Sequence, residues 1–152
     1  MSILTSNELS LISESWKLVV PDLEHHGLSF FLKLFEEYPT YQEKFFPELH
    51  QDERKIQRHG AIVLKSVGKL VAFLEANKVI ALVDAIKRLA TNHSRRGVLR
   101  EQFYPACRIL LEYLAQALGT HLSTEGALAW KRFLGTFVEL MQEGYAQLDA
   151  SK

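Results

Sequence analysis

The chain has 152 residues, of which 47% are hydrophobic and 24% are charged. This length suits one domain with a sizeable core, and the composition excludes a disordered chain. Eighteen basic and eighteen acidic residues leave no net charge, so no overall field draws the surface to nucleic acid or to anionic lipid, and small neutral partners fit better.

Helical periodicity runs through the N-terminal third of the chain, where the alternation typical of strands is almost absent. The capping-box pattern at residues 5–8 predicts a first helix, which continues until Pro21 interrupts it. A second helix is expected from about Pro21 to Glu37. Pro39 can only begin a further short turn, and residues 45–47 are expected to form a loop.

The rest of the chain shows the same period of 3.6 residues. A long helix is expected from Asp52 to the turn at 76–77, and another from Val79 to about His93. After the break at 95–97, apolar positions from Phe103 to Leu118 predict a helix that Gly119 closes. Ser123 is a plausible N-cap for the last long helix. The predicted fold class is therefore all-α.

Two of the six histidines stand out by their position on apolar helix faces. His59 shares a face with Val63 and Val67, and His93 ends a helix whose inner face is apolar. A buried imidazole needs a partner. Because no acidic ligands and no serine or cysteine nucleophile accompany this pair, two inward imidazoles suit a haem better than a zinc site.

Four motifs in order along the chain resemble those of the globin family. Residues 34–45 look like the globin passage from the second helix to a phenylalanine that stacks on the haem, here Phe45. Residues 58–64 resemble the distal motif, which places His59 over a bound gas and Val63 against the iron. Residues 89–93, followed by Gly97-Val98, resemble the proximal motif, in which His93 is the iron ligand.

The resemblance covers nearly the whole chain, since Phe103 matches the apolar residue beneath the haem, and Trp130 with the apolar stripe after it looks like the last globin helix. It implies a single globin domain over residues 1–152, with about seven to eight helices sandwiching haem b. His93 would be the proximal ligand, and His59 a candidate sixth ligand. The residues that it assigns to the cofactor are Phe31, Phe45, His59, Val63, Leu89, His93, Val98 and Phe103.

The resemblance also places Gly27 and Gly60 where globins cross their second and fifth helices at close range, and only a residue without Cβ allows two backbones to come so near. Separately, 34 positions lie between His59 and His93, slightly more than in myoglobin-like chains. We therefore expect an insertion between the two helices that carry these histidines.

Several positions depart from the common globin pattern. Phe31 replaces a distal tyrosine and cannot donate a hydrogen bond, which leaves His59 as the only distal donor, much as in neuroglobin-like proteins. Asn92 replaces the small hydroxyl residue that often orients the proximal ring. Ile62 stands where many relatives carry a basic residue for a haem propionate. Arg95 or Arg96 is an alternative partner for the propionate. Otherwise these two arginines belong to a solvated turn.

The resemblance leaves more than one function open. The first is reversible binding of O2, CO and NO, for O2 binding, transport or storage. The second adds His59 as an iron ligand, and favours redox sensing or NO and nitrite chemistry. The third is a helical regulatory module without haem. The chain contains no flavin or nicotinamide fingerprint, so NO dioxygenase or nitrite reductase turnover would depend on a separate reductase, and the sequence does not decide whether the protein is an enzyme.

The remaining expectations concern location and assembly. Neither end carries a targeting or lipidation pattern, no apolar stretch is long enough to span a bilayer, and no internal disulfide can form, so we expect a cytoplasmic protein. Cys107 shares an apolar stripe with Phe103 and Leu111, which favours a buried thiol over a link between two chains. The protein is expected to be a monomer or a weak homodimer.

Overall fold

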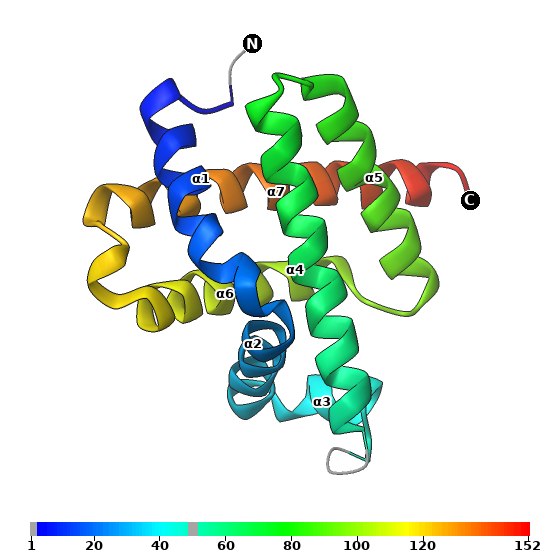
Figure 1. Cartoon of the computed structure of the whole chain (residues 1–152). Helices are drawn as coiled ribbons and strands as arrows, with labels where there is room; N and C mark the ends of the chain where they lie inside the picture. The colour runs from blue at the N-terminus through cyan, green and yellow to red at the C-terminus, as the bar shows by residue number, and fades with distance from the viewer. Residues whose placement is uncertain (1–2, 49–51) are drawn as a thin grey trace.

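The computed structural model describes residues 3–48 and 52–152, and this part of the chain is built from helices and contains no strand (Figure 1). Three short 3₁₀ turns join some of the helices. The all-α prediction is confirmed. The α-helices are α1 (Ser6–Val19), α2 (Leu23–Glu37), α3 (Pro39–Phe45), α4 (Glu53–Glu75), α5 (Val79–Arg95), α6 (Phe103–Leu118) and α7 (Thr124–Ala150). The 3₁₀ turns are η1 (Val20–Asp22), η2 (Arg100–Gln102) and η3 (Gly119–His121).

The helices cross one another rather than running parallel as in a bundle. In Figure 1, α4 and α5 lie side by side in front of α7, which runs across the molecule behind them. Helix α2 packs mainly on α4, and α6 packs on α7 and α2. Within residues 3–48 and 52–152, no helix is both long and apolar enough to cross a membrane.

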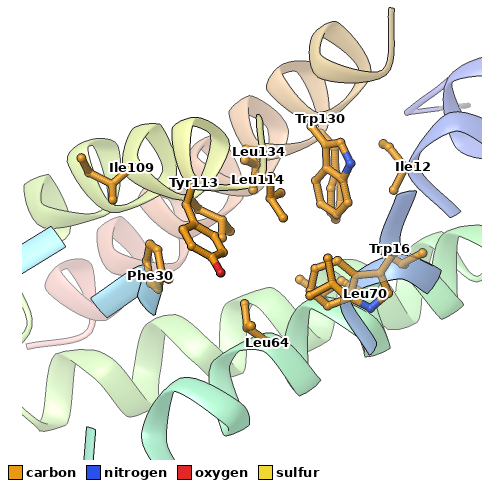
Figure 2. Close-up of a cluster of buried hydrophobic side chains, with 14 of the residues drawn as sticks. Ile12, Trp16, Phe30, Leu64, Leu70, Ile109, Tyr113, Leu114, Trp130 and Leu134 are labelled. Atoms are coloured by element: carbon orange, nitrogen blue, oxygen red, sulfur yellow. The ribbon is translucent and has the colours of Figure 1, made fainter. Parts of the chain in front are cut away.

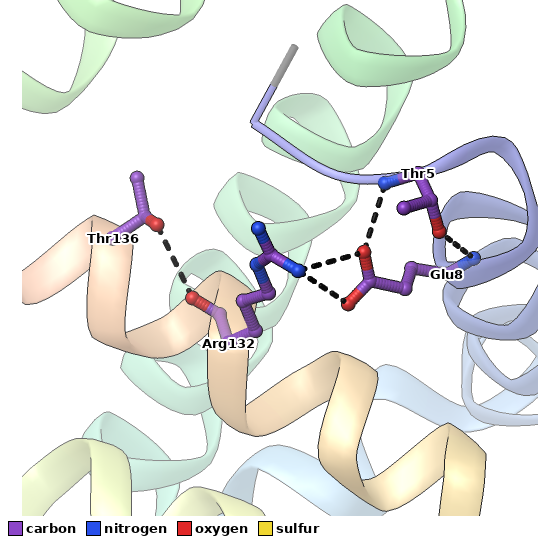
Figure 3. A network of polar contacts seen from close by, with 4 residues as sticks. All are labelled: Thr5, Glu8, Arg132 and Thr136. Carbon is purple, nitrogen blue, oxygen red and sulfur yellow. Dashed lines mark hydrogen bonds and ion pairs between the residues drawn. The ribbon is translucent and has the colours of Figure 1, made fainter.

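The first helix begins where the sequence predicts, and its cap also ties it to the last helix. Thr5 Oγ1 accepts from the Glu8 amide at 3.1 Å, and the Thr5 amide donates to Glu8 Oε1 at 2.8 Å (Figure 3). The same carboxylate lies 3.3 Å from Arg132 Nη1 of α7. The backbone hydrogen bond from Thr5, more than the nearby guanidinium, holds the pKa of Glu8 below its usual value.

Two helix boundaries differ from the expected ones. Pro21 does not open the second helix, because residues 20–22 form the 3₁₀ turn η1 and Asp22 then caps α2 by accepting from the His25 amide at 3.2 Å. Helix α3 extends through Phe45, so the loop expected at 45–47 begins one residue later. The helices α1, α4, α5 and α6 begin and end within about two residues of their predicted bounds, and α7 begins directly after its predicted N-cap, Ser123.

The prediction of an insertion between the two helices that carry His59 and His93 is wrong. Only residues 76–78 connect α4 to α5, and Asn77 closes this tight turn with a φ of 55°. The chain between His59 and His93 is otherwise helical, so it lengthens the two helices rather than forming a loop.

A buried aromatic cluster joins α1 to α7 on the side of the molecule away from α3. Figure 2 shows Trp130 of α7 beside Ile12 and Trp16 of α1, and the two indole rings are 5.6 Å apart. Trp130 is fully buried, and its Nε1 donates to Ser15 Oγ at 2.8 Å. Because a buried N–H without an acceptor is costly, this hydrogen bond fixes how α7 lies against α1.

Helices α2 and α4 touch through their backbones at the predicted glycine pair. A Cβ built on Gly27 would lie 2.3 Å from the carbonyl carbon of Gly60, and one built on Gly60 would lie 2.5 Å from the carbonyl carbon of Gly27. No side chain fits at either position. The crossing therefore fixes where α4, which carries His59, lies relative to α2, which carries Phe31.

Candidate haem site

A cavity of about 610 Å³ lies between α4 and α5 and reaches toward α2, α6 and α7. This volume is in the range of pockets that bind small molecules and cofactors. Most of its lining is apolar, and among the residues that the structure describes no aspartate or glutamate lines it and Arg96 supplies the one permanent charge. All eight residues that the sequence assigns to a cofactor lie in its wall: Phe31, Phe45, His59, Val63, Leu89, His93, Val98 and Phe103.

His93 lies near the C-terminal end of α5, with its imidazole ring fixed by the helix itself. Nδ1 lies 2.7 Å from the Leu89 carbonyl oxygen, one turn earlier. A carbonyl can only accept, so Nδ1 carries the proton and Nε2 keeps its lone pair. The edge of the Phe103 ring also meets this imidazole, at 5.5 Å and 78° between planes. The ring therefore has the tautomer and orientation that a metal ligand needs.

The environment of His93 keeps this imidazole neutral. Burial lowers its pKa, the hydrogen bond that Nδ1 donates to the Leu89 carbonyl raises it, and the Arg96 charge lowers the pKa further. A neutral ring with a free nitrogen is the form that binds a metal ion. The missing hydroxyl at Asn92 therefore does not leave the ring without an orienting bond, because the Leu89 backbone supplies one.

The segment after α5 is held in place from two sides. The Tyr145 hydroxyl of α7 donates to the Val98 carbonyl at 2.7 Å, and Lys44 Nζ of α3 donates to the Gly97 carbonyl at 2.6 Å. Gly97 has a φ of 83°, which a residue with a Cβ rarely adopts. These bonds hold Val98 at the cavity wall next to the end of the His93 helix.

His59 projects from α4 into the same cavity between aromatic side chains. The Phe31 ring of α2 lies 5.5 Å from the imidazole, and the Phe46 ring lies 6.4 Å away. Among residues 3–48 and 52–152, no protein group hydrogen-bonds this imidazole. Burial lowers its pKa first, followed by the charges of His93 and Arg96. A neutral His59 thus lines the cavity with both ring nitrogens available to a ligand.

Sequence reasoning missed some residues of the wall. Phe46, which it placed in a loop, lines the cavity together with Phe45 and packs at 5.8 Å on Phe35. Of the two arginines left open, Arg96 lines the cavity and Arg95 does not. The pair of adjacent aromatic residues before Pro47 was a signal for Phe46, whereas nothing in the local sequence separates the two arginines.

Cys107 also lines the cavity, from α6. Burial raises the pKa of its thiol to about 12, so the side chain stays protonated and apolar at neutral pH. The side chain is half-buried, so the expectation of a buried thiol is met in part.

The donor set of the cavity fits a haem group better than a bare metal ion. No cluster of three or more histidine, cysteine or acidic side chains that could hold a metal occurs among residues 3–48 and 52–152. Two neutral imidazoles in one large apolar slot instead match a macrocycle that brings its own four nitrogens and needs one or two more. Arg96 offers the cavity's one cation to the carboxylates of such a group.

The fold and the cavity define an all-helical protein with the features of a haem pocket. The model of the globin family matches residues 28–141, which is three quarters of the chain and includes both histidines. The chain belongs to the globin family. Globins bind haem and gas ligands such as O2.

Individual relatives are distant but cover most of both chains. The protein named "Anaerobic nitrite reductase HBII" from Casuarina glauca is 29% identical over 83% of this chain and 82% of its own length. A protein named "Globin" from Tritia mutabilis is 27% identical over 90% of this chain and 97% of its own. "Globin CTT-VIIB-4" from Chironomus thummi thummi is 29% identical over 86% and 82%, respectively.

Proposed function

We propose that this protein binds haem b and uses it to bind O2, CO and NO reversibly, with His93 as the proximal ligand. Haem held by His93 would supply an iron atom able to bind a diatomic gas. The observation that carries the proposal is the His93 ring, whose Nδ1 is committed to the Leu89 carbonyl at 2.7 Å and whose Nε2 is left free in a large apolar cavity.

The other side chains of the cavity contact the bound gas or exclude water. His59 donates the one hydrogen bond available to a bound gas, because Phe31 beside it has no hydroxyl. Val63 limits the space next to His59, while Phe45 and Phe46 cover the end of the slot toward α3. Leu89, Val98 and Phe103 form the apolar wall on the His93 side and keep water away from it.

A second function is supported by the free His59 imidazole. With no protein partner and a lowered pKa, this ring is able to act as the sixth ligand, which a gas must then displace. Such a site favours redox sensing, or NO and nitrite chemistry with electrons from a separate reductase. Relatives from Casuarina glauca, Brassica napus and Gossypium hirsutum bear the name anaerobic nitrite reductase, which agrees with this second function.

The proposal extends to the whole chain. We take residues 1–152 as one globin domain that works in the cytoplasm as a monomer or weak homodimer, without nucleic acid or membrane partners. A haem-free regulatory module is the weaker hypothesis, because such a module has no need of an apolar cavity of about 610 Å³ with a neutral histidine on each side.

The test is the absorption spectrum of the purified protein reconstituted with haem and reduced by dithionite without oxygen. We expect haem uptake and a spectrum that changes in His93→Ala, whereas the exposed His121→Ala serves as the matched control and leaves it unchanged. Split low-spin bands that collapse to one broad band in His59→Ala would assign His59 as a ligand and favour the second function. A broad band in both would favour O2 binding. No haem uptake, or no effect of His93→Ala, would refute the proposal.

A further inference from the structure

A tyrosine–histidine pair lies outside the cavity wall, between α2 and α6. His26 Nδ1 and the Tyr113 hydroxyl are 2.6 Å apart, and their rings meet edge to face at 5.9 Å. The two residues are 87 positions apart in the chain. Tyr113 is buried and belongs to the main apolar cluster, with its oxygen pointing away from α6 in Figure 2.

The direction of this hydrogen bond follows from the protonation of its two partners. Burial raises the pKa of the Tyr113 phenol, so the phenol keeps its proton at pH 7. A neutral imidazole has one unprotonated ring nitrogen, and with His26 Nδ1 in that form the phenol proton is directed at it. Burial and the charge of His25 lower the pKa of His26, while Asp22 opposes them, so the ring is neutral and able to accept a proton at pH 7.

No other tyrosine has such a partner. Tyr145 donates to the Val98 carbonyl, which cannot take up a proton, and Tyr38 accepts from Arg108 at 2.8 Å. Tyr104 is exposed, and Tyr41 stacks on Tyr38 at 4.9 Å. A phenol gives up an electron far more readily when its proton can leave at the same moment to a base within hydrogen-bond reach. By this criterion Tyr113 is the most easily oxidised tyrosine in the protein.

The pair is also close to the cavity. Leu110 lies one helical turn before Tyr113 on α6, Phe30 lies one turn after His26 on α2, and both line the cavity. Electron transfer needs no direct contact between donor and acceptor, whereas proton transfer needs the hydrogen bond that His26 supplies. An electron would therefore leave Tyr113 toward the cavity, whereas its proton would move to His26 of α2.

We propose that Tyr113 is a redox-active residue that returns one electron to the haem group after hydrogen peroxide has oxidised it. Hydrogen peroxide would take two electrons from a bound haem group, and two protons from solvent, to become two waters. Of the two electrons that the group must then regain, Tyr113 would supply one and a thiol or ascorbate the other. Tyr113 then restores one electron, its O–H bond breaks, and an N–H bond forms at His26 Nδ1. A thiol or ascorbate later reduces the tyrosyl radical, which regains its proton from His26. This role rests on the proposed haem binding.

The experiment is freeze-quench electron paramagnetic resonance of the haem-loaded protein mixed with hydrogen peroxide. We expect an organic radical signal that narrows when the protein contains ring-deuterated tyrosine and that disappears in Tyr113→Phe. The matched control is Tyr104→Phe, which removes an exposed phenol of the same helix and leaves the signal in place. A signal that survives Tyr113→Phe, or that Tyr104→Phe removes, would overturn the proposal.

A second variant tests the proton acceptor without removing the phenol. His26→Gln is expected to slow radical formation by about 100-fold, the usual effect of losing a positioned base. An unchanged rate would contradict the role of His26. Flash oxidation of the same samples by a ruthenium tris-bipyridine complex with persulfate makes the radical without haem chemistry, and the same dependence on Tyr113 and His26 is expected.

The outcomes separate this proposal from the proposed function. A normal haem spectrum without a Tyr113-dependent radical refutes the redox role and leaves haem binding intact. A chain that takes up no haem refutes both the proposed function and the peroxide role. Unchanged haem spectra in Tyr113→Phe and His26→Gln show that the variants are folded, so a lost signal reports on the removed group.

Discussion

The crossing of α2 and α4 and the cavity between α4 and α5 are built in opposite ways, although α4 belongs to both. At the crossing, Gly27 and Gly60 bring two backbones together with no side chain between them. In the cavity, side chains from several helices surround a volume of about 610 Å³ that they do not fill. The first region places α4 accurately, and the second uses that placement to hold His59 opposite His93.

The comparison teaches where this fold tolerates change. A close-packed contact between backbones cannot relax without moving whole helices, because interiors are packed as densely as crystals. A wall around a cavity has room for an added or removed atom. We therefore expect substitutions at the crossing and in the aromatic cluster to cost more stability than substitutions that line the cavity, which should change ligand binding instead.

The largest effect is expected for Gly27→Ala. Its new Cβ would meet the Gly60 backbone at 2.3 Å, so α2 and α4 must separate, at a cost of about 3 kcal/mol or more in the free energy of unfolding. Urea unfolding followed by circular dichroism measures the loss. The matched control is Gly135→Ala in α7, where nothing lies within 4 Å of the added Cβ. That change should stabilise the protein by about 0.5–1 kcal/mol. Equal effects at the two glycines would refute the comparison.

This crossing was among the features that the sequence could predict. Two glycines inside helices are costly, and the resemblance to globins gave a reason for both. The helices were predictable as well, because apolar periodicity and capping residues are local features. For the same reason His59 and His93 could be recognised as breaks in apolar helix faces, and the structure places both in one cavity wall.

Contacts between distant segments could not be predicted. Nothing near Lys44 in the sequence indicates that it bonds to Gly97, and nothing near His26 points to Tyr113. Likewise, the choice of Arg96 over Arg95 depends on the rotation at the end of α5, which the helix period leaves uncertain by a residue or two. Such contacts depend on how helices pack, and packing is set by the whole chain.

The next largest loss of stability is expected from a substitution in the aromatic cluster between α1 and α7. Ser15→Ala removes the acceptor of the buried Trp130 Nε1 and should lower the free energy of unfolding by about 2 kcal/mol. Thermal or urea unfolding provides the measurement. Ser66→Ala is the matched control, because this half-buried hydroxyl at the cavity wall bonds to the Ile62 carbonyl of its own helix and, within the described part of the chain, accepts no hydrogen bond from a buried N–H, so its loss should change the stability little. If both serines could be replaced at the same small cost, the cluster would not fix α7 against α1.

A smaller effect, and one on binding rather than stability, is expected for Phe31→Tyr. The ring lies 5.5 Å from His59 in the cavity wall, which has room for one more oxygen atom. The added hydroxyl would act as a second distal donor and should slow O2 dissociation by about 5-fold, equivalent to roughly 1 kcal/mol. Stopped-flow dissociation of O2 from the reduced haem-loaded protein measures this rate. An unchanged rate combined with a large loss of stability would refute the distinction between cavity and crossing.

The smallest effect is a pH dependence from His26, which lies next to Gly27 at the crossing. Burial holds the pKa of this imidazole below its usual value of about 6.5, with the His25 charge acting in the same direction and Asp22 against it. As the pH falls below about 6.5, the unfolded chain binds a proton that the folded chain does not, so the free energy of unfolding decreases. Above this pH the stability from the neutral ring is fully present.

Comparing wild type with His26→Gln isolates this contribution. Urea unfolding between about pH 7.5 and pH 5 should show a shallower loss of stability in the variant, because glutamine does not titrate. The haem-free chain is the better sample, since haem binding adds its own pH dependence through His93. Parallel curves for the two proteins would mean that His26 is solvated as freely in the folded chain as in the unfolded one. The hydrogen bond between His26 and Tyr113 would then be too exposed to solvent to keep its proton in one position. The close packing of α2 on α4 would in that case be limited to Gly27 and Gly60.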